Sequence, residues 1–229
     1  KVLYHWRAME GSTALGVKEK TNVFDVTEKA VQECLMRRQI KASVSFHEQS
    51  WNYPKVKYLA LEEESPTVSI LIPTRDRIDL LDKCITSIFG TIEYKNIEII
   101  VIDNESREER SHIYLDEIKK EKRVKVLSIP GEFNYSKLNN LATEIARGEI
   151  LLLLNNDIEA ITKGWFEEML SHAMRSEIGC VGAKLLYPDG RLQHGGVIVG
   201  LGGGAGHSHK FAGKASRGYS GHLCVSRNV

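Results

Sequence analysis

The sequence has almost no excess of charge and no long apolar run, and each shortage excludes a class of protein. Its 229 residues carry 31 lysines and arginines against 30 aspartates and glutamates, a formal net charge of +1. General nucleic-acid binding needs an excess of positive charge to neutralise phosphates, so that class is excluded. The longest unbroken apolar run, residues 150–154, is far shorter than the ~20 residues that cross a bilayer.

Cysteines are also few, and they are badly placed for structural roles. The four of them are far apart in the chain, and none belongs to a Cys-x-x-Cys pair. This spacing argues against a structural zinc site and against a disulfide framework. The apolar content of 42 % and the charged content of 27 % are ordinary for a globular protein that buries a core.

The first 65 residues differ from the rest, and we expect them to form an N-terminal extension and linker. Asp25 and Glu28 have capping-box spacing ahead of a helical repeat, which predicts a helix from Val26 to Arg38. Short extended segments are expected at 41–46 and 56–61. The charged segment 62–66 ends in proline and is typical of a linker.

From residue 67 the pattern becomes regular. Apolar runs begin at Val68, Glu98, Val124 and Ile150. They lack polar alternation, which is typical of strands buried on both faces. The segments between them carry helical stripes at 80–89, 106–118 and 138–146, with glycine stop signals at positions 90 and 148. Strands and helices that alternate in this way predict βαβ units, a parallel sheet and the α/β class.

Polar residues follow three of these strands at the carboxyl ends, where parallel sheets bind ligands. They are PTRD at 73–76, DNES at 103–106 and NND at 155–157. Capping of the next helix is a sufficient explanation for Asp79 and Ser106. It explains Asp103 and Asp157 less well, because an ionised carboxylate after an apolar strand needs a metal, a donor group or a helix start as its partner.

The two common glycine-rich phosphate loops do not fit this chain. Residues 200–205 match G-x-G-x-x-A in letters, but no helical stripe and no second βαβ half follow them. A Walker loop does not occur in the sequence. The glycine cluster is therefore either a loop that lies over a ligand or a plain surface loop.

The strand-end motifs VSILIPTRD (68–76), IVIDN (100–104) with Ser106, and LLNND (153–157) resemble those of inverting family-2 glycosyltransferases of the GT-A fold. Segments 133–140, 179–190 and 193–196 resemble the bacterial subgroup that builds O-antigen, rhamnan and related surface polysaccharides. The resemblance implies a GT-A domain over 66–229, with a nucleotide-binding half at 66–160 and the start of an acceptor half at 161–229. It also implies inverting sugar transfer from a UDP- or dTDP-linked donor to a growing polysaccharide or glycolipid.

The resemblance assigns a role to each motif. Asp157 would be the only charged metal ligand, and Mg²⁺ or Mn²⁺ would arrive mainly with the donor diphosphate. Asp103 would accept the N3–H of uracil or thymine. The expected nucleotide-binding residues are Pro73, Thr74, Asp76, Asp103, Ser106, Asn139, Asn140 and Asn156. Contacts to the sugar or phosphate are expected from Asn155, His194 and His207.

The acceptor half gives weaker signals. Thr162 is expected to cap a helix that reaches Ala173, and its Trp165 fits a core position better than a sugar platform. Strands are expected at 180–187 and 195–199 around a turn at 188–190, and at 223–227. Histidines 194, 207 and 209 could form a metal site, although polar loop histidines are the commoner outcome.

An inverting mechanism needs a general base, and the resemblance puts that base beyond Val229. We therefore expect a C-terminally truncated chain that binds a donor and transfers poorly. The alternative is a non-catalytic module that binds a nucleotide sugar or recruits a partner. A sugar-nucleotide pyrophosphorylase is disfavoured, because PTRDR supplies no glycine-rich loop after the first strand.

The expected partners and location follow from the same resemblance. They are a nucleotide-sugar donor, an oligosaccharide or lipid-linked glycan acceptor, and further glycosyltransferase domains in the same chain. Reduced thiols fit the cytoplasm, and a lipid-linked acceptor would bring the protein to the inner face of the cytoplasmic membrane.

Overall fold

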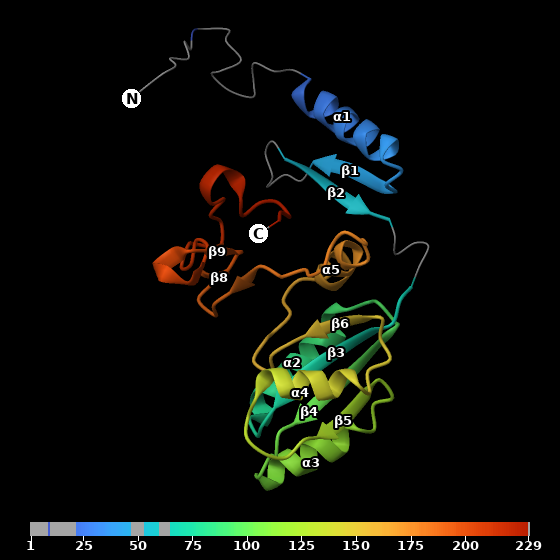
Figure 1. Ribbon diagram of the computed structural model, residues 1–229, viewed down its shortest axis with the longest axis vertical. Helices are drawn as coiled ribbons and strands as arrows, with labels where there is room; N and C mark the ends of the chain where they lie inside the picture. Colours follow the sequence, from blue (N-terminus) through green and yellow to red (C-terminus); the bar gives the residue numbers. More distant parts are fainter. Residues whose placement is uncertain (1–8, 10–21, 47–52, 60–64, 229) are drawn as a thin grey trace. The chain divides into compact units, whose positions relative to one another are not determined.

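The computed structural model describes residues 9, 22–46, 53–59 and 65–228 (Figure 1). Residues 61–181 form one compact unit, and residues 1–60 together with 182–229 form another. Each unit is described by itself below. The predicted division into an extension at 1–65 and a glycosyltransferase domain at 66–229 stays a prediction. Among the described residues, no helix is both long and apolar enough to cross a membrane.

The unit of residues 61–181 is built on a four-stranded sheet with the order β5-β4-β3-β6 (Figure 1). All three strand pairs are parallel, so the predicted α/β class with a parallel sheet is confirmed. The strands are β3 (Val68–Thr74), β4 (Ile97–Asp103), β5 (Val124–Ser128) and β6 (Ile150–Leu153). The two central strands, β3 and β4, are buried along their whole length.

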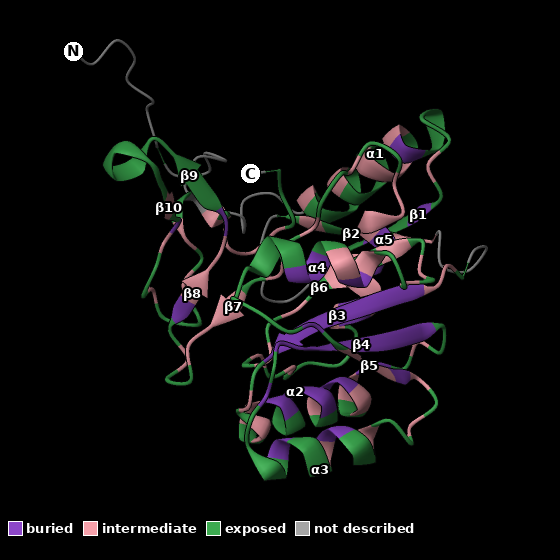
Figure 2. Ribbon diagram, turned by 60° about the horizontal axis from the view of Figure 1, so that its bottom comes forward, coloured by how far each residue is buried: buried purple, intermediate pink, exposed green. Residues whose placement is uncertain are grey.

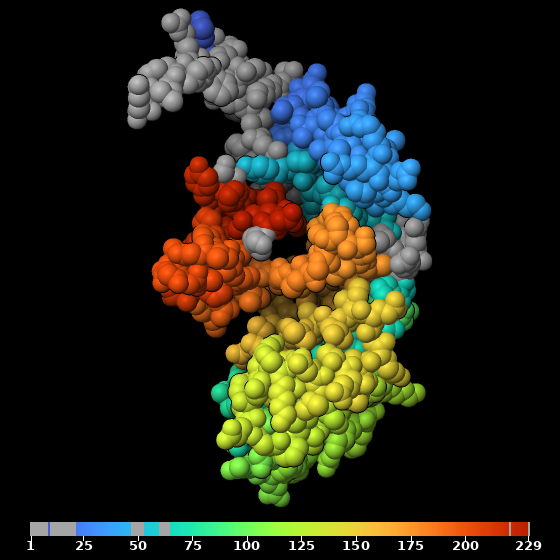
Figure 3. All heavy atoms as spheres, in the orientation of Figure 1, coloured from blue at the N-terminus to red at the C-terminus, as the bar shows by residue number. Residues whose placement is uncertain are grey.

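Helices cover both faces of this sheet, which explains the continuous apolar runs in its central strands. Three helices share a core cluster with one face, namely α2 (Ile78–Thr91), α3 (Glu109–Ile118) and α5 (Trp165–Ala173). On the other face α4 (Tyr135–Thr143) packs on Leu71, Ile100 and Ile102. Figure 2 shows α4 on one side of β3 and β4 and the pair α2 and α3 on the other, and α4 lies on the face displayed in Figure 3.

The fourth apolar run was predicted to be buried on both faces, and for β6 this is wrong. Leu151 is 44 % exposed and Leu153 is 49 % exposed, while Ile150 and Leu152 pack against the α2 face. The reason is position in the sheet, because α4 packs on β3 and β4 and none of the described residues of β6 belongs to its core cluster. Within the described part of the chain, β6 pairs only with β3 and is an edge strand.

One helix start and one helix end also differ from the predictions. Thr162 does not cap α5. The residue directly before this helix is Gly164, which has a left-handed conformation with a φ of 80°. The side chain of Trp165 packs against the core, and its indole N–H donates to Thr91 Oγ1 at 3.1 Å. The core interpretation of Trp165 is therefore confirmed. Helix α2 ends at Thr91, one residue beyond the predicted stop at Gly90.

The other unit contains short elements. They are α1 (Val23–Arg37), β1 (Ala42–Phe46), β2 (Pro54–Tyr58), β7 (Leu185–Leu186), β8 (Leu192–His194), β9 (Val197–Val199) and β10 (Ala205–His207). Helix α1 begins three residues before the predicted start, and no side chain caps it at Asn22, so the predicted capping box is wrong. The predicted strand at 180–187 is reduced to two residues, because only these pair with β8. No strand forms at 223–227.

The glycine cluster at 200–204 connects β9 to β10, which pair in antiparallel fashion. Gly200, Gly202 and Gly203 have φ values of 92°, 65° and 82°, a region that side chains with a Cβ rarely adopt. The cluster is thus the tight end of a hairpin, and its residues are exposed. This confirms that it is a loop and not a dinucleotide fingerprint.

Candidate functional site

The candidate site lies at the carboxyl ends of β3, β4 and β6. Thr74 and Asp103 are register partners in the last pair of β3 and β4, and they are 4 % and 6 % exposed. The amide of Asn156 donates to Thr74 Oγ1 at 3.0 Å. Three residues predicted from three separate motifs therefore lie together. The structure also places Pro73 here, buried within β3.

The Asp103 carboxylate is held from one side only. Its Oδ1 accepts a hydrogen bond from the backbone N–H of Ser106 at 3.0 Å. The backbone carbonyl of Asp103 accepts from the N–H of Ile129 at 2.8 Å, which fixes the strand end. Among the hydrogen bonds of the described residues, the second carboxylate oxygen has no partner. Asp103 is thus an oriented acceptor with one free oxygen.

Asp76 caps a helix, and the helix is not the one that follows it in sequence. Its Oδ1 accepts from the backbone N–H groups of Arg107 at 2.9 Å and Glu108 at 3.0 Å, and from Ser111 Oγ at 3.1 Å. The N–H of Glu108 is at the cap position of α3, where backbone donors lack partners within the helix, and the N–H of Arg107 directly precedes it. The N–H of Glu108 contributes most to lowering the pKa of Asp76, burial opposes it, and Arg107 and Ser111 lower it further.

The prediction that Ser106 caps the next helix is therefore wrong. The cap position of α3 is Glu108, which makes no side-chain cap hydrogen bond. Ser106 Oγ instead accepts the backbone N–H of Asp76 at 2.8 Å. A hydrogen-bonded chain runs from Asp76 through Ser106 to Asp103.

Two asparagines complete the strand ends. Asn104 was not predicted, although it directly follows Asp103. Its N–H donates to the Thr74 carbonyl at 2.8 Å, and its amide donates to the carbonyls of Ile129 at 2.9 Å and Gly131 at 3.1 Å. It therefore ties the loop after β5 to the ends of β3 and β4.

Asn139, on α4, is 4 % exposed and donates to the Tyr135 carbonyl at 2.8 Å. Its Oδ1, like that of Asn104, is buried without a partner among the described residues. Such orphaned acceptors are uncommon and mark a place where water or a ligand donor can bind. The neighbouring Asn140 is exposed.

Asn155 and Asp157 follow β6 and are exposed. The carbonyl of Asn155 lies 3.7 Å from Cys84 Sγ. Burial raises the pKa of the Cys84 thiol on α2 to about 12, and the negative charge of Asp157 raises it further. In the described part of the chain, no three His, Cys, Asp or Glu side chains are grouped to hold a metal. As an exposed carboxylate, Asp157 supplies one oxygen ligand of the kind that Mg²⁺ or Mn²⁺ accepts beside water and phosphate oxygens.

The histidines lie in the other unit. His194 Nδ1 and His207 Nδ1 are 2.9 Å apart with their rings nearly perpendicular, so one must donate and the other accept. Burial lowers the pKa of His194, and His207 lowers it further. His209 is engaged elsewhere, because its Nε2 accepts the N–H of Tyr219 at 3.0 Å and its Nδ1 faces Ser208 Oγ at 2.5 Å. The three histidines therefore do not form a common metal set.

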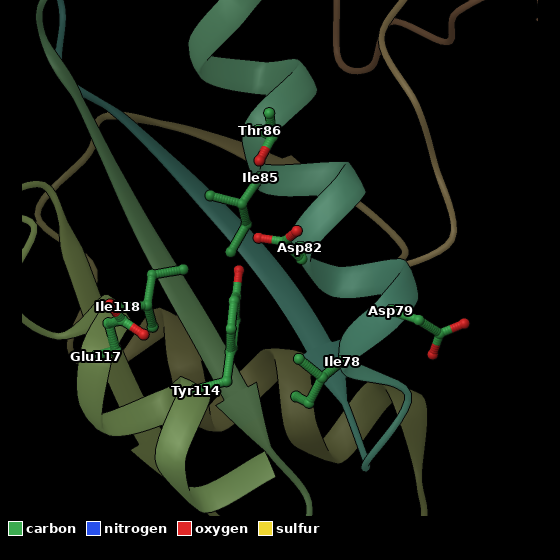
Figure 4. Close-up of a pocket in the computed structure, with 8 residues that line it drawn as sticks. All are labelled: Ile78, Asp79, Asp82, Ile85, Thr86, Tyr114, Glu117 and Ile118. Carbon is green, nitrogen blue, oxygen red and sulfur yellow. The ribbon is translucent and has the colours of Figure 1, made fainter. Parts of the chain in front are cut away.

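A separate groove of about 550 Å³ lies between α2 and α3 (Figure 4). Its lining consists of Ile78, Asp79, Asp82, Ile85, Thr86, Tyr114, Glu117 and Ile118. None of these residues belongs to the predicted nucleotide or metal set. Burial raises the pKa of Tyr114, and the charge of Asp82 raises it further. The groove is not part of the candidate site.

The carboxylates of Asp103 and Asp157 thus lie at the carboxyl ends of a parallel sheet, where α/β domains of this kind bind their ligands. Residues 69–198 match the family model described as glycosyl transferase family 2. That match covers more than half of the chain, and the protein belongs to glycosyltransferase family 2. The family expected from the motifs is thereby confirmed.

Two curated relatives are similar in sequence. The chain is 42 % identical over 230 residues to the uncharacterized protein y4gI of Sinorhizobium fredii. It is 41 % identical over 143 residues, 62 % of its own length, to the O-antigen biosynthesis protein RfbC of Myxococcus xanthus. The chain spans only 25 % of the first relative and 11 % of the second.

Solved structures show more distant likeness. The mannosyltransferase PcManGT of Pyrobaculum calidifontis, solved with GDP-Man and Mn²⁺, has a TM-score of 0.46 and 16 % identity, over 52 % of this chain and 36 % of that one. GalNAc-T7, solved with UDP, GalNAc and Mn²⁺, has a TM-score of 0.45 and 20 % identity, over 58 % of this chain and 25 % of that one.

Proposed function

We propose that the chain carries the donor-binding part of a glycosyltransferase that moves a sugar, with inversion, from a UDP- or dTDP-linked donor to a growing polysaccharide or glycolipid. The family match supports sugar transfer as the reaction class. The name of the Myxococcus relative supports a surface polysaccharide as the product class. We further propose Pro73, Thr74, Asp103, Ser106, Asn139, Asn140 and Asn156 as the nucleotide-binding set.

The observation that carries the base preference is the one-sided hold on Asp103. Ser106 N–H occupies one carboxylate oxygen at 3.0 Å, and the second oxygen is free to accept. Uracil and thymine present a donor at N3, whereas cytosine presents a lone pair there, which a carboxylate repels. The site therefore favours UDP or dTDP over CDP.

Exchange of Asp103 for asparagine tests this preference. In Asp103→Asn, the amide oxygen is expected to stay with Ser106 N–H, so the amide NH₂ faces the base. UDP binding should weaken by ~1–3 kcal/mol, because a charged hydrogen bond is lost and two donors then face each other. CDP binding should strengthen, because its N3 gains a donor. Calorimetric titration with UDP and CDP measures both changes.

Asp103→Ala serves as the matched control. It removes the acceptor without supplying a donor, so UDP binding should weaken and CDP binding should stay weak. Equal UDP affinities in the original chain and both variants would contradict the assignment of Asp103.

We propose Mg²⁺ or Mn²⁺ as the cofactor, with Asp157 as its only charged protein ligand. A divalent cation neutralises the charge that develops on the leaving diphosphate. Asn155 contributes polar contacts to the sugar or phosphate. The contacts expected from His194 and His207 stay predictions, because these two residues belong to the other unit. The remaining metal ligands are water and phosphate oxygens, so metal and nucleotide bind together.

Asp157→Asn is expected to uncouple the metal from the nucleotide. In the original chain, Mn²⁺ should bind poorly alone and should strengthen UDP binding roughly tenfold or more, because metal affinity depends on diphosphate oxygens. In Asp157→Asn that enhancement should disappear, and in Glu159→Gln, an exposed neighbour, it should remain. Titration of UDP with and without Mn²⁺ checks this, and tight Mn²⁺ binding without nucleotide would refute it.

Acceptor and location are proposed on the family likeness. An oligosaccharide or lipid-linked glycan acceptor would place the protein in the cytoplasm, at the inner face of the cytoplasmic membrane. The two relatives are about four and about six times as long as this chain, which leaves room for further glycosyltransferase domains in the same protein.

A further inference from the structure

The turn between β3 and α2 is held in an unfavourable backbone conformation. Asp76 and Arg77 have φ values of 52° and 46°, so two consecutive residues with side chains lie in the left-handed region. Glu105, in the loop after β4, has a φ of 61° and lies there too. Left-handed conformations are disfavoured for residues other than glycine and persist only where surrounding contacts hold them.

The contacts that hold Asp76 come from the neighbouring loop. Its Oδ1 takes three donors from residues 107, 108 and 111, at 2.9 to 3.1 Å. Ser111 is fully buried, so its hydroxyl has little access to water as an alternative partner. The lowered pKa of Asp76 keeps this carboxylate ionised at neutral pH, which suits a cap at the positive end of α3.

The backbone of Asp76 reaches the same loop. Its N–H donates to Ser106 Oγ at 2.8 Å, and the N–H of Ser106 donates to Asp103 Oδ1 at 3.0 Å. The carboxylate and the N–H of one residue thus fix residues 106–108 from two directions. That segment supplies the only hydrogen bond to the Asp103 carboxylate among the described residues.

We propose that Asp76 is a positioning residue that acts through Ser106 and the start of α3 to orient the Asp103 carboxylate, and that it does not contact the nucleotide. This inference rests on the proposed function, because it names Asp103 as the acceptor for the base. It reassigns Asp76 from the predicted nucleotide contacts to the group that supports them.

A double-mutant cycle distinguishes support from direct contact, because residues that act through one another are not additive. Asp76→Ala should weaken UDP binding about tenfold when Asp103 is present and less than about twofold in an Asp103→Ala background. Asp76→Asn should retain affinity within about threefold, because asparagine tolerates the left-handed region and keeps an acceptor oxygen. Asp79→Ala removes an exposed carboxylate in the first turn of α2 that accepts hydrogen bonds from Arg77 and none from the described residues 103–111, so UDP affinity should be unchanged.

Equal losses in both Asp103 backgrounds would overturn the proposal and assign a direct contact, and no loss in either would overturn it as well. If Asp76→Ala does not fold, Ser111→Ala removes one donor to Asp76 from a nearly isosteric site and should weaken UDP in the same non-additive way.

Amide hydrogen exchange separates this proposal from the proposed function, since it needs no nucleotide. In Asp76→Ala, the amides of Ser106, Arg107 and Glu108 should exchange faster, and in Asp79→Ala they should not. Unchanged exchange would overturn the positioning role whatever UDP does. If the amides exchange faster in Asp76→Ala but the protein binds no UDP, the hydrogen bonds from Asp76 through Ser106 to Asp103 are supported and the proposed donor binding is contradicted.

Discussion

The Gly148→Ala variant is expected to lose about 3 kcal/mol of unfolding free energy, because overpacking and a broken buried hydrogen bond act together. An added Cβ would lie 2.4 Å from the backbone nitrogen of Ser69, 2.7 Å from its Oγ and 2.9 Å from the carbonyl of Thr67. Two of these atoms are backbone of the segment that enters β3, where little can move. The N–H of Gly148 also donates to Ser69 Oγ at 2.9 Å, and the methyl group would separate them.

Gly90→Ala is the matched control. Gly90 lies in α2, and a Cβ there would meet nothing within 4 Å. Alanine favours helices over glycine by about 1 kcal/mol, so this variant should be unchanged or slightly more stable. Urea unfolding followed by circular dichroism compares the two. A Gly148→Ala midpoint equal to that of the original chain would show that the close approach of Gly148 to β3 is not present.

Loss of the Glu98 charge is the second large expected effect. Glu98 is 2 % exposed on β4, and burial alone would raise its pKa. Ser69 Oγ donates to it at 2.6 Å and the N–H of Arg147 at 2.6 Å, and with Lys125 these hold its pKa at about 2 instead of 4.5. The Lys125 and Arg147 side chains are 39 % and 69 % exposed, so water screens their charges and the two short hydrogen bonds matter more.

The direction of the pH effect follows from the lowered pKa. The stabilisation by ionised Glu98 is complete above pH 4.5 and is lost as the pH falls towards 2. The whole shift corresponds to about 3 kcal/mol. Glu98→Gln should therefore be less stable at pH 7 and should lose this part of the acid sensitivity.

Glu149→Gln, at an exposed neighbouring position, should unfold with acid as the original chain does. Urea midpoints measured between pH 2 and 7 test the pair. If the urea midpoints of Glu98→Gln and of the original chain changed with pH in parallel, Glu98 would not be the source of the acid sensitivity.

The sheet could be predicted because its signal is local. The runs that start at Val68, Val124 and Ile150 became strands where expected, and the strand predicted from Glu98 begins at Ile97. The edge position of β6 could not be predicted, since a run of leucines reads the same in the centre of a sheet and at its edge. The predicted strand at 180–187 failed for a related reason, because apolar residues without an adjacent partner strand do not form a ladder.

The sequence predicted that some of the candidate residues lie together, but it did not predict the hydrogen bonds that hold them. The motifs correctly brought Thr74, Asp103 and Asn156 to one place, because parallel strands align their carboxyl ends. Capping rules consider only residues close in sequence to the start of a helix, so they predicted Ser106 as the cap of α3. The observed cap comes from Asp76, which is more than 30 residues before the helix and next to it only in the folded sheet.

The edge position of β6 also has a colloidal consequence. Residues 150–154 are an uninterrupted apolar stretch without charge or proline, and alternate leucines of the strand are half exposed. Stretches of this composition on an open edge recruit identical strands from other molecules. Neither Leu151 nor Leu153 is a gatekeeper that would discourage such pairing. In a concentrated solution of this chain, molecules would therefore tend to associate by pairing their β6 strands.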